Sequence, residues 1–488
     1  MSRIAKNLKK EGKKIVLCHG VFDLIHPGHI RHFTDAKRHG DILIVTVVAD
    51  RYVLKGPGRP IFPQELRCEV LSALSLIDYL SVVDSRSATS VIQKLRPHVY
   101  VRGSDEKQSL QEEAAARTIG ARIVTTEDIA FSSSQLINAH FDIYPPKTKA
   151  FLEMVKRTHT AADIIKELQG LARTKILVIG DTIIDQYHYS RPLGKSYKEP
   201  IVVHGFLRAE SYAGGTLATA NHIAALSETV SLVTILGKRQ SFESFIRKKL
   251  RDTITPKFFY REGSGTIVKR RYIDEFTGYK LFQISFVNDE PIASGLEAHI
   301  YEYLAELLPN FEIVVVNDFG HGFLTKKLIR LITRKAKYLA LNVQANSVNF
   351  GFNIVTKYPR ADYVCIDNQE IRLATHDKYG DLDRLTKKIF KKLSASDIIV
   401  TKGPYGSLSY SKKHGMIEIP ALTGRIVDRV GAGDALFSIT VPCVWAQMDP
   451  TTVGFIGNVA ASLKIATVGN KFPIDFAELT NYITRLLK

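Results

Sequence analysis

Short apolar stretches alternate with longer segments of helical periodicity along most of the chain. Between residues 15 and 143, DILIVTVV (41–48) and HVYVRG (98–103) have the length and β-branched content of buried strands, and QELRCEVLSALSLI (64–77) has the spacing of a helix. Alternating strands and helices are typical of a parallel sheet covered by helices. The pattern therefore predicts an α/β fold, a doubly wound, Rossmann-like sheet, for this part of the chain.

A second alternating series begins at KILVIGD (175–181) and continues to the C-terminus. Its strands IVVVND (313–318), YVCID (363–367) and DIIVTKG (397–403) each end in a polar residue or glycine. In open α/β sheets ligands bind at the carboxyl ends of the strands, so these closing residues are candidates for a site. We expect a second α/β domain here.

Consecutive prolines at 145 and 146 break both periodicities, and apolar positions at helical spacing follow over about 150–171. We therefore predict a first domain at 1–143, a linker and one connecting helix at 144–172, and a second domain at 173–488. The two series carry different motifs, which favours a fusion of two domains over a duplication.

Composition excludes several classes of protein. The four cysteines lie far apart, which argues against a zinc site or a disulfide framework. No apolar run approaches the roughly 18 residues that cross a bilayer. The basic N-terminus leads into a strand and not into a signal-peptide core. We expect a cytoplasmic homo-oligomer without membrane contact. The net charge of +18 is spread over lysine pairs on predicted helix faces without an RNA-binding aromatic signature, so we expect no nucleic-acid partner.

The stretch HGVFDLIHPGH (19–29) lies where the first strand, from Ile15, turns into a helix near Ile30. Gly20 allows a close backbone approach, and the helix start offers free N–H groups to an anion. His26 and His29, three residues apart on a helix start, would project toward the same anion. The alternative is a pair of packing histidines.

Four segments in order resemble the HxGH nucleotidyltransferase superfamily, which includes cytidylyltransferases and heptose-phosphate adenylyltransferases: HGVFDLIHPGH, LKGPGRP (54–60), VRGSDEK (101–107) and FSSSQLI (131–137). The resemblance implies that His26 and His29 touch the phosphates and that Lys55 neutralises the reacting group. The remaining residues that it assigns to the nucleotide are Gly20, Phe22, Asp23, Arg102, Asp105, Ser132, Ser133 and Ser134.

The nucleotide itself is less determined. Cytidylyltransferases for glycerol phosphate and choline phosphate carry an RTEGIST-like stretch, whereas this chain reads TTEDIAFSSS (125–134), without the arginine. The absence of this arginine favours ATP as the nucleotide, and CTP remains the alternative. Mg²⁺ is expected to accompany the triphosphate.

Near the C-terminus, IVDRVGAGDALFS (426–438) places a glycine-flanked turn before an apolar helix. Backbone N–H groups at 431–433 could hold phosphate charge, with Asp434 as a base. A hydroxyl must lose its proton when it attacks a phosphate, so a kinase needs such a carboxylate. The alternative is an aspartate that only caps the helix.

Ordered segments here resemble the ribokinase-like sugar kinases, and in particular the kinase half of the bifunctional heptose-phosphate kinase/nucleotidyltransferases. They are GDTIIDQYHY (180–189), KEP (198–200), AGGTLATANHIA (213–224), VTKGPYGS (400–407) and GAGD. The resemblance implies sugar contacts from Asp181, Asp185, Gly214, Gly215 and Asn221. It implies ATP contacts from Thr401, Gly403, Gly431, Ala432 and Gly433, with Asp434 as the base.

Several positions depart from that pattern. Asp428 to Gly431 reads Asp-Arg-Val-Gly and lacks a threonine, and NVQANS (342–347) stands where active relatives read Asp-Pro-Lys-Gly. The metal-placing Asn-x-x-Glu becomes Asp367-Asn368-Gln369-Glu370. The nucleotidyltransferase also leads the chain, an order that we expect to be reversed relative to the familiar enzymes.

Three hypotheses follow. In the first, a kinase acting on a sugar or sugar phosphate supplies a 1-phosphate to a nucleotidyltransferase, which makes an ADP- or CDP-heptose-like product. In the second, only the nucleotidyltransferase works and the kinase domain is degenerate. In the third, the chain is a nucleotide- or nucleic-acid-binding regulator. The sequence does not determine the sugar, its anomer or the oligomeric state.

Overall fold

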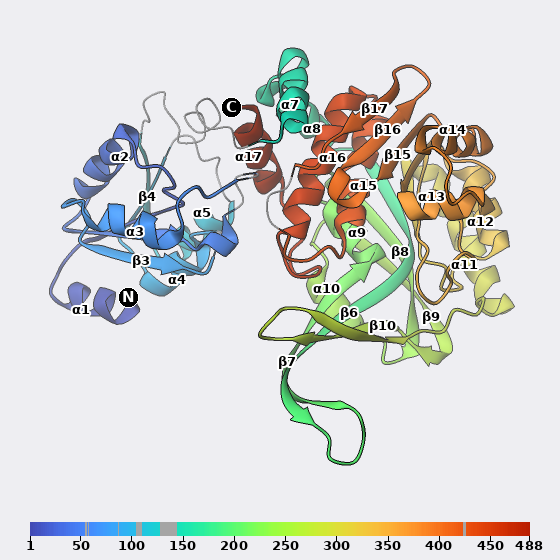
Figure 1. Cartoon of the computed structure of the whole chain (residues 1–488), viewed down its shortest axis with the longest axis horizontal. Helices are drawn as coiled ribbons and strands as arrows, with labels where there is room; N and C mark the ends of the chain where they lie inside the picture. Colours follow the sequence, from blue (N-terminus) through green and yellow to red (C-terminus); the bar gives the residue numbers. More distant parts are fainter. Residues whose placement is uncertain (54–55, 57, 86, 104–109, 127–143, 423–425) are drawn as a thin grey trace. The chain divides into compact units, whose positions relative to one another are not determined.

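The computed structural model describes the chain except residues 54–55, 57, 86, 104–109, 127–143 and 423–425 (Figure 1). The described residues pack as two units, the first formed by 1–153 together with 477–488 and the second by 154–422 together with 426–476. The domain bounds expected at 143 and 172 stay predictions.

The first unit is built on a parallel sheet, five-stranded within the described residues, in the order β3-β2-β1-β4-β5. The order reverses between β1 and β4, which opens a crevice at the carboxyl ends of these strands. The strands are β1 (Ile15–Gly20), β2 (Ile42–Val48), β3 (Tyr79–Val83), β4 (Val99–Gly103) and β5 (Arg122–Thr126).

Helices cover both faces of this sheet, over two apolar clusters that share no residue. One cluster holds Ile15, Leu17 and Tyr100, and the other holds Val16, Cys18 and Phe33, because successive strand residues point to opposite faces. The predicted doubly wound fold is confirmed. The helices are α1 (Ser2–Lys10), α2 (Pro27–Lys37), α3 (Gln64–Ser72), α4 (Thr89–Leu95) and α5 (Leu110–Thr118), with the short 3₁₀ helix η1 (Asp50–Tyr52).

The predicted connecting helix over 150–171 is wrong in one respect, because two helices stand there. They are α7 (Pro146–Thr158) and α8 (Ala161–Gly170). Thr160 lies in extended backbone and caps α8, where its hydroxyl accepts from the Asp163 N–H while the Asp163 carboxylate accepts from the Thr160 N–H. Such a capping box starts a new helix. The helical spacing of apolar residues over 150–171 therefore continues across a break between two helices.

The second unit contains a larger sheet, twelve-stranded within the described residues, with the main order β11-β10-β6-β12-β13-β14-β15-β16-β17. Strands β7 and β8 also pair with β6, and β9 pairs with β8. Its strands are β6 (Lys175–Lys195), β7 (Val202–Gly215), β8 (Thr229–Arg239), β9 (Ile254–Gly265), β10 (Ile267–Asp274), β11 (Lys280–Phe286), β12 (Ile313–Asp318), β13 (Leu339–Val343), β14 (Tyr363–Asp367), β15 (Asp397–Thr401), β16 (Ser407–Ser411) and β17 (Gly415–Ile419).

Strand β6 is much longer than the predicted strand over 175–181. Its first part pairs in parallel with β8 and β12 inside the α/β core, and its second part pairs with β7 and β10. The β6–β7 hairpin projects from the body of the second unit (Figure 1). The sequence predicted only the apolar start of β6. The later residues of this strand are less completely buried, and its last residues are exposed.

Two sets of helices cover the core of this sheet. Helix α15 (Ala432–Trp445) contacts both α9 (Thr216–Ile223) and α16 (Pro450–Ile465), and α9 and α15 rest on the central strands. The other set packs in a large apolar cluster with β12 to β15. Its members are α11 (Ser294–Leu307), α12 (Lys326–Lys335), α13 (Asn368–Thr375) and α14 (Leu382–Leu393).

Smaller elements complete the description. They are α10 (Glu243–Lys249), α17 (Phe476–Leu487), η2 (Leu308–Asn310), η3 (Val355–Lys357) and η4 (Gly403–Tyr405). Residues 477–488, which include nearly all of α17, pack within the first unit. Across the described ranges, no helix is both long enough and apolar enough to span a bilayer.

Candidate functional sites

The turn from β1 into α2 forms the candidate site of the first unit. Gly20 ends β1, and a Cβ at this position would lie 2.9 Å from the Phe22 ring, so the turn needs a glycine. Phe22 has φ 51°, in the left-handed region, and its ring is buried against Phe33. This compact turn presents the start of α2 at the carboxyl edge of the sheet.

His26 and His29 come together at the start of α2, as expected. His26 is the N-cap, and its Nδ1 accepts from the Gly28 N–H at 3.1 Å. The ring centroids of His26 and His29 lie 4.1 Å apart, and His29 meets the Phe22 ring edge-on at 5.5 Å. Because Nδ1 of His26 faces the backbone, its Nε2 edge is the part that can reach a ligand.

Asp23 performs a structural task in this turn. Its carboxylate is buried and accepts from the N–H groups of Ile61 and Phe62 at 2.8 and 3.0 Å, and Arg59 lies 3.7 Å away. Asp23 therefore holds the loop that follows the predicted lysine position. Burial lowers the pKa of Arg59, and the Asp23 carboxylate opposes that effect.

Other expected residues of this site lie outside the described part of the chain, namely Lys55, Asp105, Ser132, Ser133 and Ser134. Arg102 is described, at the end of β4, where it lies 3.4 Å from Glu113 and 3.4 Å from the Thr125 hydroxyl. His19, the residue before Gly20 in β1, has its Nδ1 2.9 Å from the Thr46 hydroxyl.

The candidate site of the second unit begins at the turn before α15. Gly431 is the N-cap of this helix with φ 82°, and a Cβ there would lie 2.6 Å from Asn470 Oδ1. A Cβ at Gly433 would meet nothing within 4 Å. The turn therefore combines a required glycine with open space beside the first N–H groups of α15, as an anion site needs.

Asp434 lies in the first turn of α15 with a side chain that is almost fully buried. Its Oδ1 accepts from Gln344 Nε2 at 2.6 Å and from Asn317 Nδ2 at 3.3 Å. Burial raises the pKa of this carboxyl, and the two amide donors oppose that rise. A helix cap would use its carboxylate on backbone N–H groups, whereas Asp434 receives side-chain donors from β12 and from the residue after β13.

Asp185 and Gly214 are brought together on adjacent strands. A Cβ at Gly214 would lie 2.2 Å from Asp185 Oδ2, so the carboxylate occupies the space that the glycine leaves. Asp185 pairs with Arg271 at 2.5 Å, and Asn470 Nδ2 lies 3.4 Å from its other oxygen. Gly215 has φ 57°, which ends β7 and starts α9.

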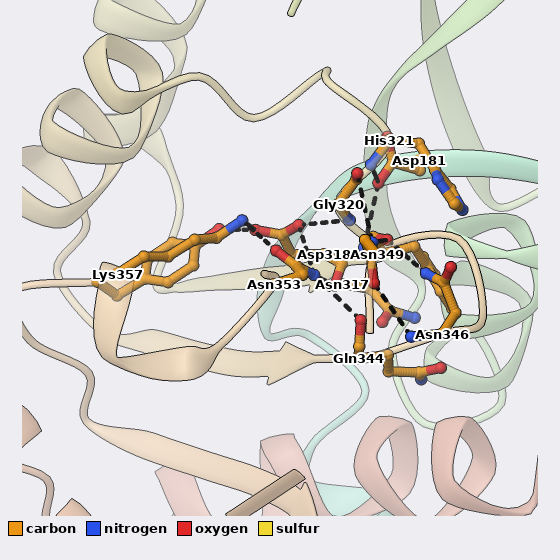
Figure 2. Close-up of polar contacts among 12 residues, drawn as sticks. Asp181, Asn317, Asp318, Gly320, His321, Gln344, Asn346, Asn349, Asn353 and Lys357 are labelled. Carbon is orange, nitrogen blue, oxygen red and sulfur yellow. Dashed lines mark hydrogen bonds and ion pairs between the residues drawn. The ribbon is translucent and has the colours of Figure 1, made fainter. Parts of the chain in front are cut away.

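Asp181 lies in the centre of the second unit with no exposed surface. Its Oδ2 accepts from the N–H groups of Phe319 and His321 at 3.1 and 3.5 Å, and its Oδ1 is buried without a partner among the described residues. Burial and the nearby Asp318 raise the pKa of Asp181 to about 7. Figure 2 shows Asp181 and His321 beside the loop that follows β12.

Further buried polar atoms near Asp181 also lack hydrogen-bond partners in the described part of the chain. They include Asn317 Oδ1 and both ring nitrogens of His321. Burial lowers the pKa of His321 to about 4, so the ring is neutral at pH 7. Since buried polar groups in proteins are nearly always paired, such a set indicates a place where a polar ligand binds.

Lys269 on β10 completes this region and was missed by sequence reasoning. It lies opposite Asp185 in the parallel pairing of β10 and β6, and its Nζ is 5.5 Å from the Phe319 ring centroid. Burial lowers its pKa, while the charges of Asp185, Asp181 and Asp434 raise it. The charge of Lys269 thus interacts with all three of these carboxylates. The available signal was a lysine within the alternating stretch TIVKRRYID.

Some predicted positions are engaged elsewhere. The Asn221 amide donates to the Lys249 carbonyl at 3.0 Å and accepts from the Arg251 N–H at 3.0 Å, so it ties α9 to the end of α10. Its contact with a sugar stays a prediction. Thr401 ends β15 and Gly403 begins η4, and the Thr401 hydroxyl lies 3.4 Å from Asp367.

Glu370 caps α13 and does not stand free for a metal ion. Its two oxygens accept from the N–H groups of Asp367 and Ala345 at 2.9 and 3.0 Å, and burial raises its pKa to about 7. Within the described residues, no three His, Cys, Asp or Glu side chains are grouped to hold a metal.

Comparisons with known proteins agree with this division. Residues 173–476 match the pfkB family carbohydrate kinases, and residues 17–147 match the cytidylyltransferase-like family. The reversed domain order that we expected is wrong. The matches give a cytidylyltransferase-like region followed by a kinase region.

Among curated relatives, the chain is similar to the bifunctional protein HldE of Trichlorobacter lovleyi, with 22% identity over 305 residues, which are 62% of this chain and 61% of that protein. A shorter match, 35% identical over 136 residues, links it to HldE of Desulfatibacillum aliphaticivorans and covers 27% of this chain and 28% of that protein. The chain thus spans at most about three fifths of the length of these two relatives.

Among solved structures, Escherichia coli phosphofructokinase-2 in complex with substrates and products has a TM-score of 0.52 with 15% identity, covering 64% of this chain and 100% of that protein. The same enzyme in complex with potassium has a TM-score of 0.51, also with 15% identity, and covers 65% of this chain and 100% of that protein. At this identity the likeness concerns the fold alone, and it agrees with the ribokinase-like α/β fold that we predicted.

Proposed function

The chain belongs to the pfkB family of carbohydrate kinases, and from this premise we propose that it makes a nucleotide-activated sugar in two steps. The second unit phosphorylates a sugar or sugar phosphate with ATP. The first unit then joins the resulting 1-phosphate to a nucleotide and releases pyrophosphate. The observation that carries the proposal is the buried Asp434 carboxylate beside the Gly431 turn, with Asp185 and Lys269 facing it.

In the kinase step the acceptor hydroxyl must lose its proton as its oxygen attacks the γ-phosphorus. Asp434 accepts that proton, the bond from the γ-phosphorus to the bridging oxygen breaks, and ADP leaves. The N–H groups at 431–433 and the start of α15 stabilise the phosphate charge. Burial of Asp434 strengthens each of these interactions because the local dielectric is low.

The acceptor lies, in this proposal, among the polar atoms that lack partners. Asp181 Oδ1 and Asn317 Oδ1 accept from sugar hydroxyls, and Lys269 offers a donor to a sugar oxygen or to an anionic group. A bound polar ligand would satisfy the buried groups, which supports an acceptor site at this place.

In the nucleotidyl step the attacking sugar phosphate is already an anion, so no base is needed. Its oxygen attacks the α-phosphorus, and the bond to pyrophosphate breaks. His26 and His29 donate to the phosphate oxygens, and we propose that Lys55 and Ser132 to Ser134 contact the reacting and leaving groups. One positioned donor contributes roughly 3–4 kcal/mol to such a transition state.

We propose ATP as the nucleotide of the first unit, with CTP as the alternative, so that the product is an ADP- or CDP-heptose-like sugar. The missing arginine before the serine turn supports ATP. Mg²⁺ accompanies both triphosphates and neutralises their charge. The use of two cellular triphosphate reactions favours the cytoplasm as the location, and nucleic acid and membrane are not partners in this scheme.

We also propose a homo-oligomer formed through the β6–β7 hairpin. Leu193, Tyr197, Ile201 and Phe206 each expose more than half of their surface on this hairpin or its turn. Exposed apolar groups gathered on one projecting element are typical of a protein interface.

A second candidate function keeps only the nucleotidyl transfer. It is favoured by the ion pair between Arg271 and Asp185, which occupies a carboxylate expected to face the sugar, and by the departures at 342–347. In that case the second unit binds a sugar or serves as a scaffold.

The test measures two products from the full-length chain with ATP or CTP and Mg²⁺. ADP formation is measured with free and 6- or 7-phosphorylated hexoses and heptoses, and pyrophosphate release is measured with sugar 1-phosphates. Both products are expected. Pyrophosphate without ADP for any acceptor would support the second candidate, and neither product would overturn both.

A further inference from the structure

Asn342, near the end of β13, and Gln344, just after it, are amides where the expected kinase pattern has charged residues, and Gln344 reaches Asp434. Gln344 Nε2 donates to Asp434 Oδ1 at 2.6 Å and lies 2.7 Å from Asn342 Oδ1 (Figure 2 shows Gln344 in this network). Asn317 donates to the same Asp434 oxygen at 3.3 Å and to the Thr219 hydroxyl at 2.7 Å. For the described residues, every hydrogen bond that ends on this carboxylate ends on Oδ1.

The backbone of Gln344 is itself fixed. Asn353 Nδ2 donates to the Gln344 carbonyl and to the Asp318 carbonyl, each at 3.0 Å. The Gln344 N–H donates to the Asp318 carbonyl at 2.9 Å, and the next N–H, at Ala345, donates to Glu370 at 3.0 Å. These bonds fix the loop to β12 on one side and to α13 on the other.

Two further asparagines attach the rest of the loop. Asn346 Nδ2 and Asn349 Nδ2 donate to the Phe319 carbonyl at 2.8 and 2.6 Å, as Figure 2 shows for the segment after Asp318. Asp318 is in turn held by Lys357 and by the Tyr358 hydroxyl, each at 2.6 Å. The four amides of this clamp are Gln344, Asn346, Asn349 and Asn353.

We propose that Gln344 is a positioning residue for the phosphoryl transfer: it holds Asp434 Oδ1, and Oδ2 is thereby turned toward the acceptor hydroxyl as the proton-accepting oxygen. The amide clamp supplies the rigidity that the residues of the usual pattern would otherwise give. This inference rests on the proposed kinase function of the second unit. It assigns a task to the stretch NVQANS, which the family resemblance leaves unexplained.

The surroundings of Asp434 determine what the loss of Gln344 does. The charged or titratable groups that face it are Asp185 on β6, Lys269 on β10, Cys365 on β14 and Glu370 on α13. The carboxylate is buried among them, so each donor that it keeps favours its ionised form. Removal of the Gln344 donor therefore raises the pKa of Asp434, and a positive charge at that position lowers it.

The experiment compares the full-length wild-type chain with Gln344→Leu and Gln344→Lys, and uses Gln169→Leu, at an exposed position of α8, as the matched control. The titration of Asp434 is followed by the carboxyl signal of ¹³C-aspartate-labelled protein, identified by its absence in Asp434→Asn. This readout needs no substrate. The pH dependence of kcat for ADP formation is measured with whichever sugar of the panel is turned over.

The midpoint for Asp434 is expected to rise in Gln344→Leu, to fall in Gln344→Lys and not to move in Gln169→Leu. The acidic limb of kcat should shift in the same directions, and KM should change less than kcat. An unchanged midpoint in both Gln344 variants would overturn the positioning role. If no sugar is turned over by the wild type, the proposed function fails, and the carboxyl titration still decides whether Gln344 controls Asp434.

Discussion

Arg271 on β10 donates to the Asp185 carboxylate on β6 at 2.5 Å, with only 13% and 5% of the two side chains exposed. The pair joins the strand that carries two candidate sugar ligands to the strand that carries Lys269. A carboxylate in this setting depends on its partner, because removal of one member of a buried ion pair leaves an uncompensated charge.

Arg271→Met should therefore lower the free energy of unfolding of the second unit by about 3 kcal/mol. The measurement is urea denaturation followed by the fluorescence of Trp445, the single tryptophan of the chain, which lies in α15. Arg270→Met is the matched control, since Arg270 donates to the neutral Gln186 amide. If Arg271→Met lowers the free energy of unfolding no more than Arg270→Met does, solvent already stabilises the charge of Asp185 without Arg271.

Local sequence pattern predicted the parallel cores of both units, and it failed where pairing partners decide the structure. The start of β6 was predicted because its residues are apolar on both faces, but its continuation into the hairpin depends on pairing with β7, which begins after the turn at 196–201. Likewise, Thr160 divides the connecting segment through a hydrogen-bonded cap that apolar spacing does not reveal.

The candidate sites divide in the same way. His26, His29, Gly431 and Asp434 were predicted because each lies within a few residues of a strand end or helix start. Lys269 reaches the second site from β10 and Gln344 from the residue after β13, so only the folded sheet brings them near Asp434. The role of Asn221 could not be predicted because its partners lie on α10 and the residues after it.

Asp434→Asn should abolish ADP formation and leave pyrophosphate release intact. The amide keeps the size of the carboxylate and can still accept through its oxygen, but it cannot take the acceptor proton. A loss of at least 100-fold in kcat is expected, on the order of a missing general base. ADP formation at the wild-type rate would remove Asp434 from the mechanism.

His29→Ala should have the reciprocal effect. Loss of one phosphate donor at the start of α2 costs about 10²–10³ in the rate of pyrophosphate release. His29 is preferred to His26 for this test, because His26 also caps α2 and its loss would destabilise the helix by about 1 kcal/mol. ADP formation by the same variant serves as the internal control, and a loss of both activities in a folded chain would contradict two separate sites.

Asp181→Asn should stabilise the second unit at pH 8. The pKa of Asp181 is raised from 3.8 to about 7 in the folded chain. Between these values the folded chain keeps a proton that the unfolded chain has released, so the stability contributed by this group falls as pH rises through the window. The gain should approach about 4 kcal/mol at pH 8, at 1.36 kcal/mol per pKa unit, and vanish near pH 4.

Denaturation midpoints reported by Trp445 at pH 4, 6 and 8 check this expectation. Asp252→Asn, at an exposed position, controls for the removal of a carboxylate. A gain that does not depend on pH would show that Asp181 is not held protonated by the fold.

Phe206→Ser combined with Leu193→Ser should dissociate the proposed oligomer without loss of the folded state. Phe206 and Leu193 expose 65% and 61% of their surface on the β6–β7 hairpin, so neither substitution opens a cavity in the core. If the hairpins meet, each copy loses two apolar contacts of about 1.5–3 kcal/mol, and a dimer of moderate affinity would become a monomer at micromolar concentration. Sedimentation velocity measures the change, and Phe352→Ser, which alters a phenylalanine outside the hairpin that exposes 91% of its surface, is the control. A wild-type chain that sediments as a monomer would exclude the hairpin interface, whereas an oligomer that survives the double substitution would place the interface on another surface.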